Sequence, residues 1–365
     1  MGYKSVNHKK QKFKNMKTQK MKVDFPNNST KIKSYLKTVM FLLMFTLVFT
    51  ACSEDEDTTP EQQEEQMLPD GQALLQRLEQ NRQEDLQTFS LDAADGGSIT
   101  GEQGTRIFFP PNALAYQDGS PVTGEVTIEL VEIYNKADML LKNMPTNGKR
   151  PDGTIEMIKS AGEFFINATK NEEQLTLTQP MQLQSKGVPF EDVDPDMGLF
   201  IVGCDDPLDF NCTEAWEEDE FTQVGMGEVQ NQDGTWSAVY LVDLSEFGWT
   251  NLDRWYNYDG ELTTLNVDVP EGYNGGNCEV YLSYDGEDSG LARMDVYDEN
   301  TGMFTEHFGM IPVGQEVHII IIAEINGVLH YTIQGTTITQ DHIEVMAEPQ
   351  PGTEADLFVL IEDLP

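Results

Sequence analysis

The stretch VHIIIIAEINGVLHYTI, residues 317–333, places an Asn-Gly pair between two apolar runs. Asn-Gly supplies the positive φ angles of a two-residue turn, so the stretch predicts an antiparallel β-hairpin. A turn at Asn326–Gly327 would pair Ala323 with His330 across the hairpin. Side chains alternate between the faces of a strand, so His318 and His330 are expected on opposite sides of the sheet, where they cannot share a metal ion.

The same turn signal recurs along the chain. Seven Asp-Gly and three Asn-Gly pairs separate short apolar runs such as 126–130, 175–177 and 238–242. Strands at this spacing predict an all-β protein with two or three β-sandwich-like domains. Residues 68–89 are the exception, because their apolar residues recur at helical spacing, and a short helical turn is expected at 136–142.

These patterns predict six segments in chain order. They are a signal peptide (1–51), an acidic, disordered tether (52–70), a helix (71–90), a first β-sandwich (91–186), an acidic, aromatic-rich connecting β region (187–260) and a second β-sandwich (261–365) with a closing strand at 358–361.

The charge is strongly negative and unevenly distributed. The chain of 365 residues holds 63 acidic against 23 basic residues. Eleven of those bases, and only one of the acids, precede Cys52, so the rest of the chain carries 62 acids against 12 bases. Such a surface repels phosphate backbones, which excludes nucleic acid as a partner.

The N-terminal segment has the layout of an export signal. Three lysines at 31, 33 and 37 precede a mostly apolar run at 39–51, which is too short to span a bilayer. The run ends in Thr50-Ala51 and is followed directly by Cys52, which resembles the lipobox of bacterial lipoproteins. The resemblance implies that Cys52 is lipidated and anchors the chain to a membrane. A plain cleaved signal with an incidental cysteine is the alternative.

The acidic run after Cys52 resembles the surface-export signal of Bacteroidota lipoproteins. It reads Ser-Glu-Asp-Glu-Asp at residues 53–57 and holds no apolar residue to bury. The resemblance implies an outer-membrane location facing the cell exterior. The alternative is a spacer on the periplasmic side.

Two further resemblances concern the folded part. Gly96-Gly97-Ser98-Ile99, Phe109-Pro110-Pro111-Asn112-Ala113-Leu114 and Val126-Thr127-Ile128 resemble the β-sandwich module shared by ankyrins and netrin receptors, over residues 96–130. That likeness implies a fold and no activity. The tract at 247–254, FGWTNLDR, is similar to uncharacterised Bacteroidota lipoproteins.

The three cysteines beyond the anchor allow one disulfide. Cys204 and Cys212 are close in sequence, and in an exported protein they could close a small loop, or else remain as thiols. Cys278 is expected as a buried core residue.

Two patterns are candidates for ligand sites. Asp192, Asp194 and Asp196 alternate before a glycine, which is typical either of a calcium loop or of a solvated acidic turn. Trp249, Trp255 and Tyr258 lie among amides and carboxylates, as in glycan-binding surfaces, but such rings also fill seams between domains.

No common catalytic motif occurs, so the protein is expected not to be an enzyme, and no cofactor beyond the candidate calcium is expected. The sequence favours a lipid-anchored, surface-exposed β-sandwich lipoprotein that acts as a binding or structural module of the cell envelope, with a glycan or an envelope protein as its partner. Alternatives are an accessory glycan-binding lipoprotein of a saccharide-uptake system and, less favoured, a carboxylate-dependent glycosidase.

Overall fold

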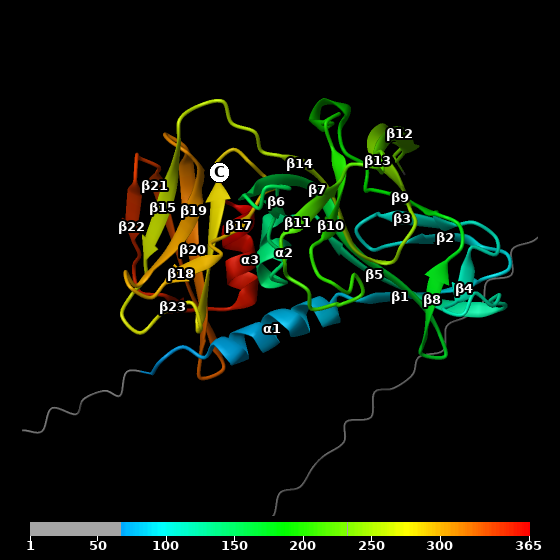
Figure 1. The fold of residues 1–365 in the computed structure, drawn as a ribbon, viewed down its shortest axis with the longest axis horizontal. Helices are drawn as coiled ribbons and strands as arrows, with labels where there is room; N and C mark the ends of the chain where they lie inside the picture. The colour runs from blue at the N-terminus through cyan, green and yellow to red at the C-terminus, as the bar shows by residue number, and fades with distance from the viewer. Residues whose placement is uncertain (1–66, 232) are drawn as a thin grey trace, which may run out of the picture. The chain divides into compact units, whose positions relative to one another are not determined.

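The computed structural model describes residues 67–231 and 233–365, and it confirms the all-β class (Figure 1). The expected signal peptide, the expected lipidation site Cys52 and most of the expected tether lie outside the described residues. The described chain contains two β-sandwiches, each built from two sheets, with helices between them.

The larger sheet of the first sandwich has nine strands. They are β1 (Gln87–Asp92), β4 (Leu114–Tyr116), β5 (Glu125–Ile133), β6 (Asn147–Lys149), β7 (Ile155–Lys170), β8 (Glu173–Leu177), β10 (Gly198–Val202), β11 (Trp216–Asp219) and β14 (Gly248–Trp255). The order is β1-β5-β7-β14-β10-β11-β6, and β8 joins β4 to β7.

The facing sheet of the first sandwich has five strands. They are β2 (Gly97–Thr100), β3 (Arg106–Phe109), β9 (Met181–Gln184), β12 (Gly225–Gln230) and β13 (Trp236–Leu244). The order is β12-β13-β9-β3-β2. Apolar side chains of both sheets, among them Ile107, Ile128 and Leu183, form one fully buried core. A 3-10 turn, η1 (Phe190–Asp192), follows β9.

The second sandwich follows the first in sequence. One sheet has the strands β15 (Leu262–Asp268), β18 (Val296–Asp298), β19 (Met303–Pro312) and β22 (His342–Val345), in the order β18-β19-β15-β22. The other has β16 (Cys278–Tyr284), β17 (Ala292–Arg293), β20 (Glu316–Ile325), β21 (Val328–Thr337) and β23 (Gln350–Pro351), in the order β17-β16-β20-β21-β23. Leu265, Val280 and Ile319 belong to its separate core.

The hairpin of β20 and β21 has the register that the sequence predicts. Ala323 is opposite His330, and the φ angles of Asn326 and Gly327 are 52° and 79°, as a two-residue hairpin turn requires. The His318 ring contacts Asp285, whereas the His330 ring contacts the carbonyl of Val328. The two histidine rings therefore have different partners and do not contact a common group.

Three helices fill the seam between the sandwiches: α1 (Gly71–Glu84), α2 (Lys136–Leu141) and α3 (Glu354–Glu362). In Figure 1, α2 and α3 stand between the two sets of strands, and α1 runs below them along the lower edge. Their apolar residues form a third core with side chains from both sandwiches, including Trp249 of β14 and Ile320 of β20. The seam is thus a packed core and joins the two sandwiches into one unit.

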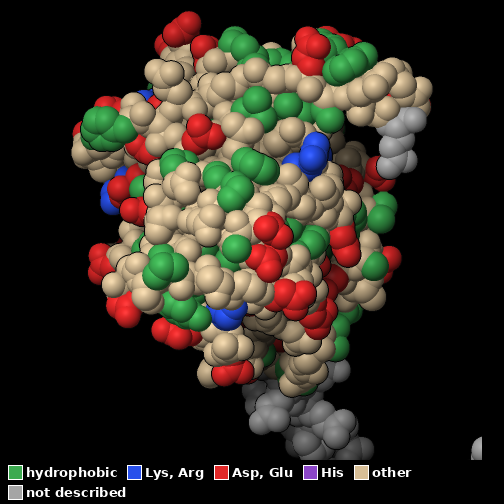
Figure 2. All heavy atoms as spheres, turned by 90° about the vertical axis from the view of Figure 1, so that its right-hand side faces the viewer, with side chains coloured by type: hydrophobic (Ala, Val, Ile, Leu, Met, Phe, Trp, Pro, Cys, Tyr) green, Lys and Arg blue, Asp and Glu red, His purple; other side chains and the backbone are tan. Residues whose placement is uncertain are grey.

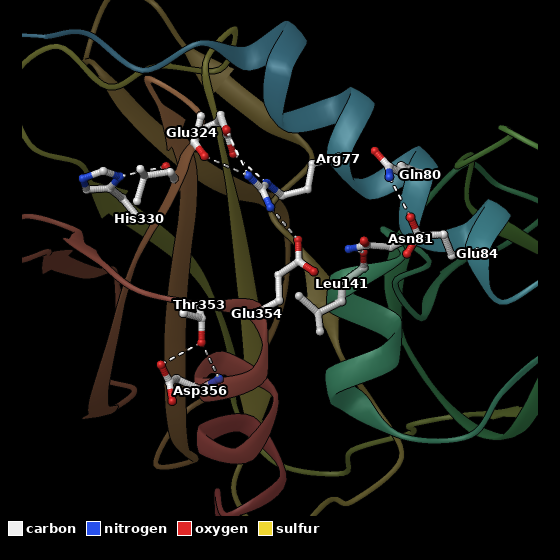
Figure 3. Close-up of polar contacts among 12 residues, drawn as sticks. Arg77, Gln80, Asn81, Glu84, Leu141, Glu324, His330, Thr353, Glu354 and Asp356 are labelled. Atoms are coloured by element: carbon white, nitrogen blue, oxygen red, sulfur yellow. Dashed lines mark hydrogen bonds and ion pairs between the residues drawn. The ribbon is translucent and has the colours of Figure 1, made fainter. Parts of the chain in front are cut away.

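Helix α1 is held to the second sandwich by polar contacts as well (Figure 3). Asp70 caps the helix by accepting hydrogen bonds from the amides of residues 72 and 73, and its own amide donates to the carbonyl of Glu324. The Arg77 guanidinium pairs with the carboxylates of Glu324 and Glu354. Asn81 donates to the carbonyl of Leu141 in α2.

Three expectations about these elements are wrong. The first helix ends at Glu84, because Phe89 belongs to β1 and is opposite Ile128 in a six-residue ladder. The apolar run at 358–361 lies in α3, where Leu357 and Ile361 are one helical turn apart and buried. The region 187–260 is not a connection between the two sandwiches, because its strands belong to both sheets of the first sandwich.

No helix among the described residues combines the length and the apolar character needed to cross a membrane.

Candidate functional site

The candidate site is a cleft where the first sandwich meets the second. It comprises two adjoining hollows that share Glu156, Met157, Tyr284 and Met310. The more open hollow has a volume of about 120 Å³. The cleft walls come from the start of β7 and the loop after β14 on one side, and from β16 and β19 on the other.

The wall from the first sandwich is built around Arg150. Its guanidinium lies 4.1 Å from the centre of the Trp255 ring and forms an ion pair with Glu156. It also donates a hydrogen bond of 3.2 Å to the side-chain oxygen of Asn257. Stacking on the indole fixes the guanidinium plane, so Arg150 presents its donors in a constant orientation.

Tyrosines line the floor and rim of the cleft. The rings of Tyr256 and Tyr284 meet edge to face, with centroids 5.1 Å apart, and Lys159 lies 4.9 Å from the centre of the Tyr256 ring. Tyr258 also lines the cleft and is 43% exposed, so its ring is available to a ligand. Burial raises the pKa of Tyr256 and Tyr284, which keeps both hydroxyls protonated.

Two glutamates bring carboxyl groups to the cleft. Burial raises the pKa of Glu156, although its partner Arg150 opposes the shift. Burial also raises the pKa of Glu306 to about 7, against the effect of three amide donors in its own strand. The cleft therefore combines an exposed aromatic ring, a fixed guanidinium, an amide and two carboxyls of unusual pKa.

The aromatic residues singled out from the sequence do not form one surface. Trp249 and Trp255 are 2% and 8% exposed, and both indoles belong to the seam core. The Trp249 N–H donates to the carbonyl of Phe210, and the Trp255 N–H donates to Glu218. Trp249 and Trp255 therefore fit the interpretation as residues that fill a seam between domains. A glycan platform made of Trp249, Trp255 and Tyr258 is wrong, because only Tyr258 of the three is exposed.

The aspartate series does not form a calcium loop. Asp194 forms an ion pair with Arg254 and accepts the amide of Asp196, while the side chains of Asp192 and Asp196 are exposed. No group of three His, Cys, Asp or Glu side chains in the described part of the chain is arranged to hold a metal ion. The interpretation as an acidic turn fits the observed contacts.

The cysteines are placed in two environments. Cys204 and Cys212 form a disulfide that closes a loop packed on the seam core. Phe210 of this loop contacts Phe165 edge to face, with ring centroids 4.9 Å apart. Cys278 is a buried free thiol, and burial raises its pKa to about 12, so it is unreactive.

An acidic pair lies inside the protein and away from the cleft. Glu163 and Asp253 are completely buried, and none of their four carboxyl oxygens has a hydrogen-bond partner. Burial raises the pKa of both groups well above their ordinary values, and the proximity of Asp253 adds to the shift of Glu163. Neither residue lines the cleft, so we assign the pair a structural role as protonated acids.

A larger hollow of about 320 Å³ lies beside the end of α1, but the buried carboxylate that lines it already has hydrogen-bond partners within the protein. Its buried carboxylate, Glu132, accepts hydrogen bonds from the side chain of Gln87 and from the amides of Gln103 and Thr105. These contacts hold the 101–105 loop in place. The interdomain cleft is therefore the better candidate.

Sequence reasoning missed Arg150, Glu156 and Glu306. The chain has 63 carboxylates, so neither glutamate differs from the background by its local sequence. The sequence signal that points to the cleft is the aromatic cluster at residues 255–258, because its Tyr256, Asn257 and Tyr258 line the cleft.

Comparison of the chain with models of known protein families and with curated proteins gives no match, so the assignment of a function depends on the sequence signals and on the geometry of the cleft.

Proposed function

We propose that this protein is a lipid-anchored binding module of the bacterial outer membrane that faces the cell exterior. The basic and apolar leader ending at Cys52 and the acidic run that follows support this assignment. A lipidated Cys52 would anchor the chain to the membrane by a lipid alone.

The cleft is the binding site, and its ligand is a neutral sugar unit at the end of a glycan. One observation carries this assignment: the exposed Tyr258 ring lies at a cleft that Arg150, Glu156 and Asn257 also line. An aromatic ring can stack on the C–H face of a sugar while the polar groups bind its hydroxyls. In this proposal the sugar contacts Tyr258 and its polar neighbours, and the two buried tryptophans take no part in binding.

The charge distribution favours a neutral ligand. Arg150 and Arg293, the two cations that line the cleft, are paired with Glu156 and Glu279. Lys159, which lies beside the Tyr256 ring, is paired with Glu287. Figure 2 shows acidic side chains spread over one end of the molecule with few lysines and arginines among them. A phosphorylated or otherwise anionic ligand would meet repulsion at the surface and no free cation in the cleft.

The role is binding, and catalysis is not part of it. Hydrolysis of a glycoside requires one carboxyl group as general acid and a second as nucleophile or base. In the cleft Glu156 is committed to Arg150, and Glu306 accepts the amides of Phe308, Gly309 and Met310. Both glutamates have internal partners that fix the shape of the walls, and Asp295, the third carboxyl of the cleft, is not free either.

Titration of the purified full chain with a panel of neutral oligosaccharides, followed by NMR, tests the binding role. We expect shifts of residues 256–258 and weaker binding by about fivefold in Tyr258→Ala, since loss of one aromatic contact costs about 1 kcal/mol. Phe221→Ala is the matched control, because Phe221 is 94% exposed and does not line the cleft. Equal affinity of both variants, or no binding by any sugar, would overturn the assignment.

Protease treatment of intact cells tests the location. A surface protein should lose its second sandwich while a periplasmic marker survives. A Cys52→Ser variant should no longer incorporate labelled palmitate or fractionate with membranes; continued labelling of that variant would refute the lipidation site.

A further inference from the structure

The strand β12 forms an open edge of the first sandwich. It is the end strand in the order β12-β13-β9-β3-β2, and in the described part of the chain its one pairing is with β13. Figure 1 shows β12 at the outer end of the first sandwich, beyond β13. No residue of β12 lines the cleft, so this edge is separate from the proposed sugar site.

The hydrogen bonds of β13 show which backbone groups of β12 point outward. Ala238 lies opposite Glu228, and its amide and its carbonyl both bond to Val188, on the side of β13 away from β12. Hydrogen-bonded pairs alternate along an antiparallel ladder, so Glu228 and the residues two positions before and after it make no ladder bond to β13. The bond from the Asn231 amide to the Thr235 carbonyl, three positions further on, agrees with this alternation. The amides and carbonyls of three residues are therefore directed to the open edge: Met226, Glu228 and Gln230.

The edge lacks most of the features that keep edge strands from pairing with other chains, which are prolines, lysines, bulges and short length. β12 is six residues long, GMGEVQ, and holds no proline and no lysine. Its register with β13 runs without a bulge from residue 225 to residue 230. Its one charged side chain is Glu228. The strand therefore presents a continuous template to which a further strand can be added.

Exposed apolar side chains flank this glutamate. Met226 is 58% exposed, and Trp236, which lies opposite Gln230 on β13, is 54% exposed. Alternate residues of a strand and their cross-strand partners share one face, so Met226, Glu228 and Trp236 lie on the same face of the β12–β13 pair. Figure 2 views this end of the molecule, where exposed hydrophobic side chains are interspersed with acidic ones.

Charge determines which strand fits the template. Residues 187–253, which include β12 and β13, hold seventeen acidic residues and no lysine, arginine or histidine. A second copy that added its own β12 in antiparallel register would place Glu228 opposite Glu228, and like charges in that position destabilise a ladder. A strand with a basic residue at that position would instead form a pair of opposite charges.

We propose that the open edge of β12 binds an extended segment of another protein, which is added as a sixth strand to the five-stranded sheet and has a basic residue two positions from an apolar residue on each side. The outward amides and carbonyls of Met226, Glu228 and Gln230 bond to its backbone. The Glu228 carboxylate pairs with its basic residue, and Met226 and Trp236 contact its apolar residues. This site does not depend on the sugar assigned to the cleft.

Titration of the purified full chain with a capped peptide, Thr-Val-Thr-Lys-Thr-Val-Thr, tests the proposal by NMR. We expect resonance shifts in β12 and β13 and slower hydrogen exchange of the Met226, Glu228 and Gln230 amides. At a peptide concentration ten times the dissociation constant, exchange should slow about tenfold, because these amides exchange from the unbound protein. The same peptide with glutamate in place of lysine should bind about tenfold more weakly, since it replaces an attraction by a repulsion.

Two substitutions of Glu228 separate the backbone contribution from that of charge. Glu228→Pro removes an outward donor and leaves the ladder to β13 intact, so it should weaken binding of the lysine peptide by about tenfold or more. Glu228→Lys should reverse the preference, so that the glutamate peptide binds more tightly than the lysine peptide. Glu173→Lys, at an exposed position on β8, makes the same change in net charge and should keep the wild-type preference.

Equal binding of the two peptides by the wild type, or unchanged exchange of the three outward amides, would overturn the proposal. A dimer of the free protein that Glu228→Pro converts to a monomer in sedimentation would also overturn it, because the edge would then be occupied by a second copy. If Glu228→Pro does not fold, the reversal of preference in Glu228→Lys still decides the outcome. Sugar binding is measured with a different ligand at residues 256–258, so failure of either site leaves the other result standing.

Discussion

Arg77 and Glu324 form a two-point ion pair across 247 residues of chain. The guanidinium Nε lies 2.6 Å from Oε2, and a terminal nitrogen lies 3.0 Å from Oε1. The Glu324 side chain is almost completely buried, so its charge depends on this partner. The pair attaches the first helix to the central hairpin of the second sandwich (Figure 3).

Arg77→Gln should therefore destabilise the protein by about 2–4 kcal/mol, because it leaves the Glu324 carboxylate buried without its cation. Urea unfolding measures the loss. Arg106→Gln, at an exposed position on β3, is the control and should change the free energy of unfolding by less than about 0.5 kcal/mol. A loss of similar size in both variants would contradict the role of the pair.

The buried acids predict a pH dependence of stability. The pKa values of Glu163 and Asp253 are raised in the folded state, so the folded protein binds their protons more tightly than the unfolded chain does. The free energy of unfolding is therefore highest at low pH and falls as pH rises above the ordinary pKa values of these groups. Each group can change the slope by up to about 1.4 kcal/mol per pH unit. Glu163→Gln should be more stable than the wild type at pH 8, and its unfolding free energy should depend less on pH. Glu173→Gln, at an exposed position, should match the wild type.

Removal of the disulfide should weaken the seam. Cys204 and Cys212 close a short loop whose Phe210 packs against Phe165 and Trp249. The Cys204→Ser/Cys212→Ser double variant should lose about 2–3 kcal/mol, the range expected for a loop of this length. Thermal unfolding of the variant, compared with the wild type with and without reductant, checks this. A reductant that leaves the wild-type midpoint unchanged would contradict it.

Two aromatic substitutions should differ in their effect on stability, because one ring lies in the seam core and the other lines the cleft. Trp249→Ala should cost about 3–5 kcal/mol, because the indole is buried and its N–H donates to the chain at Phe210. Tyr258→Ala should cost less than about 1 kcal/mol, since its ring is exposed. Chemical unfolding of both variants gives the comparison. A large loss for Tyr258→Ala would mean that this ring has a packing role.

Much of the local structure could be predicted from the sequence. The register of β20 and β21 followed from one Asn-Gly pair, and the short helix at 136–142 was expected close to its observed bounds. Both depend on contacts within a few residues. The helical character of 354–362 was missed, although Thr353 followed by Asp356 is a helix start signal, and Thr353 indeed accepts the amide of Asp356.

The orientation of the tryptophans could not be predicted in the same way. A strand with one solvated face shows an alternating pattern, but β14 is buried along nearly its whole length on both sides. Asn251 and Asp253 are polar and therefore indicated an exposed face of this strand, but both are completely buried. The cleft was beyond sequence reasoning because its walls come from segments between residues 147 and 311.

The seam core has a consequence for the order of folding. It takes side chains from α1 near the start of the described chain and from Leu357 and Ile361 near its end. Each sandwich can bury its own core as it is made, but the surface between them stays apolar and uncovered until residue 361 is available. The centre of the protein is therefore completed last, once the helix at residues 354–362 has been synthesised.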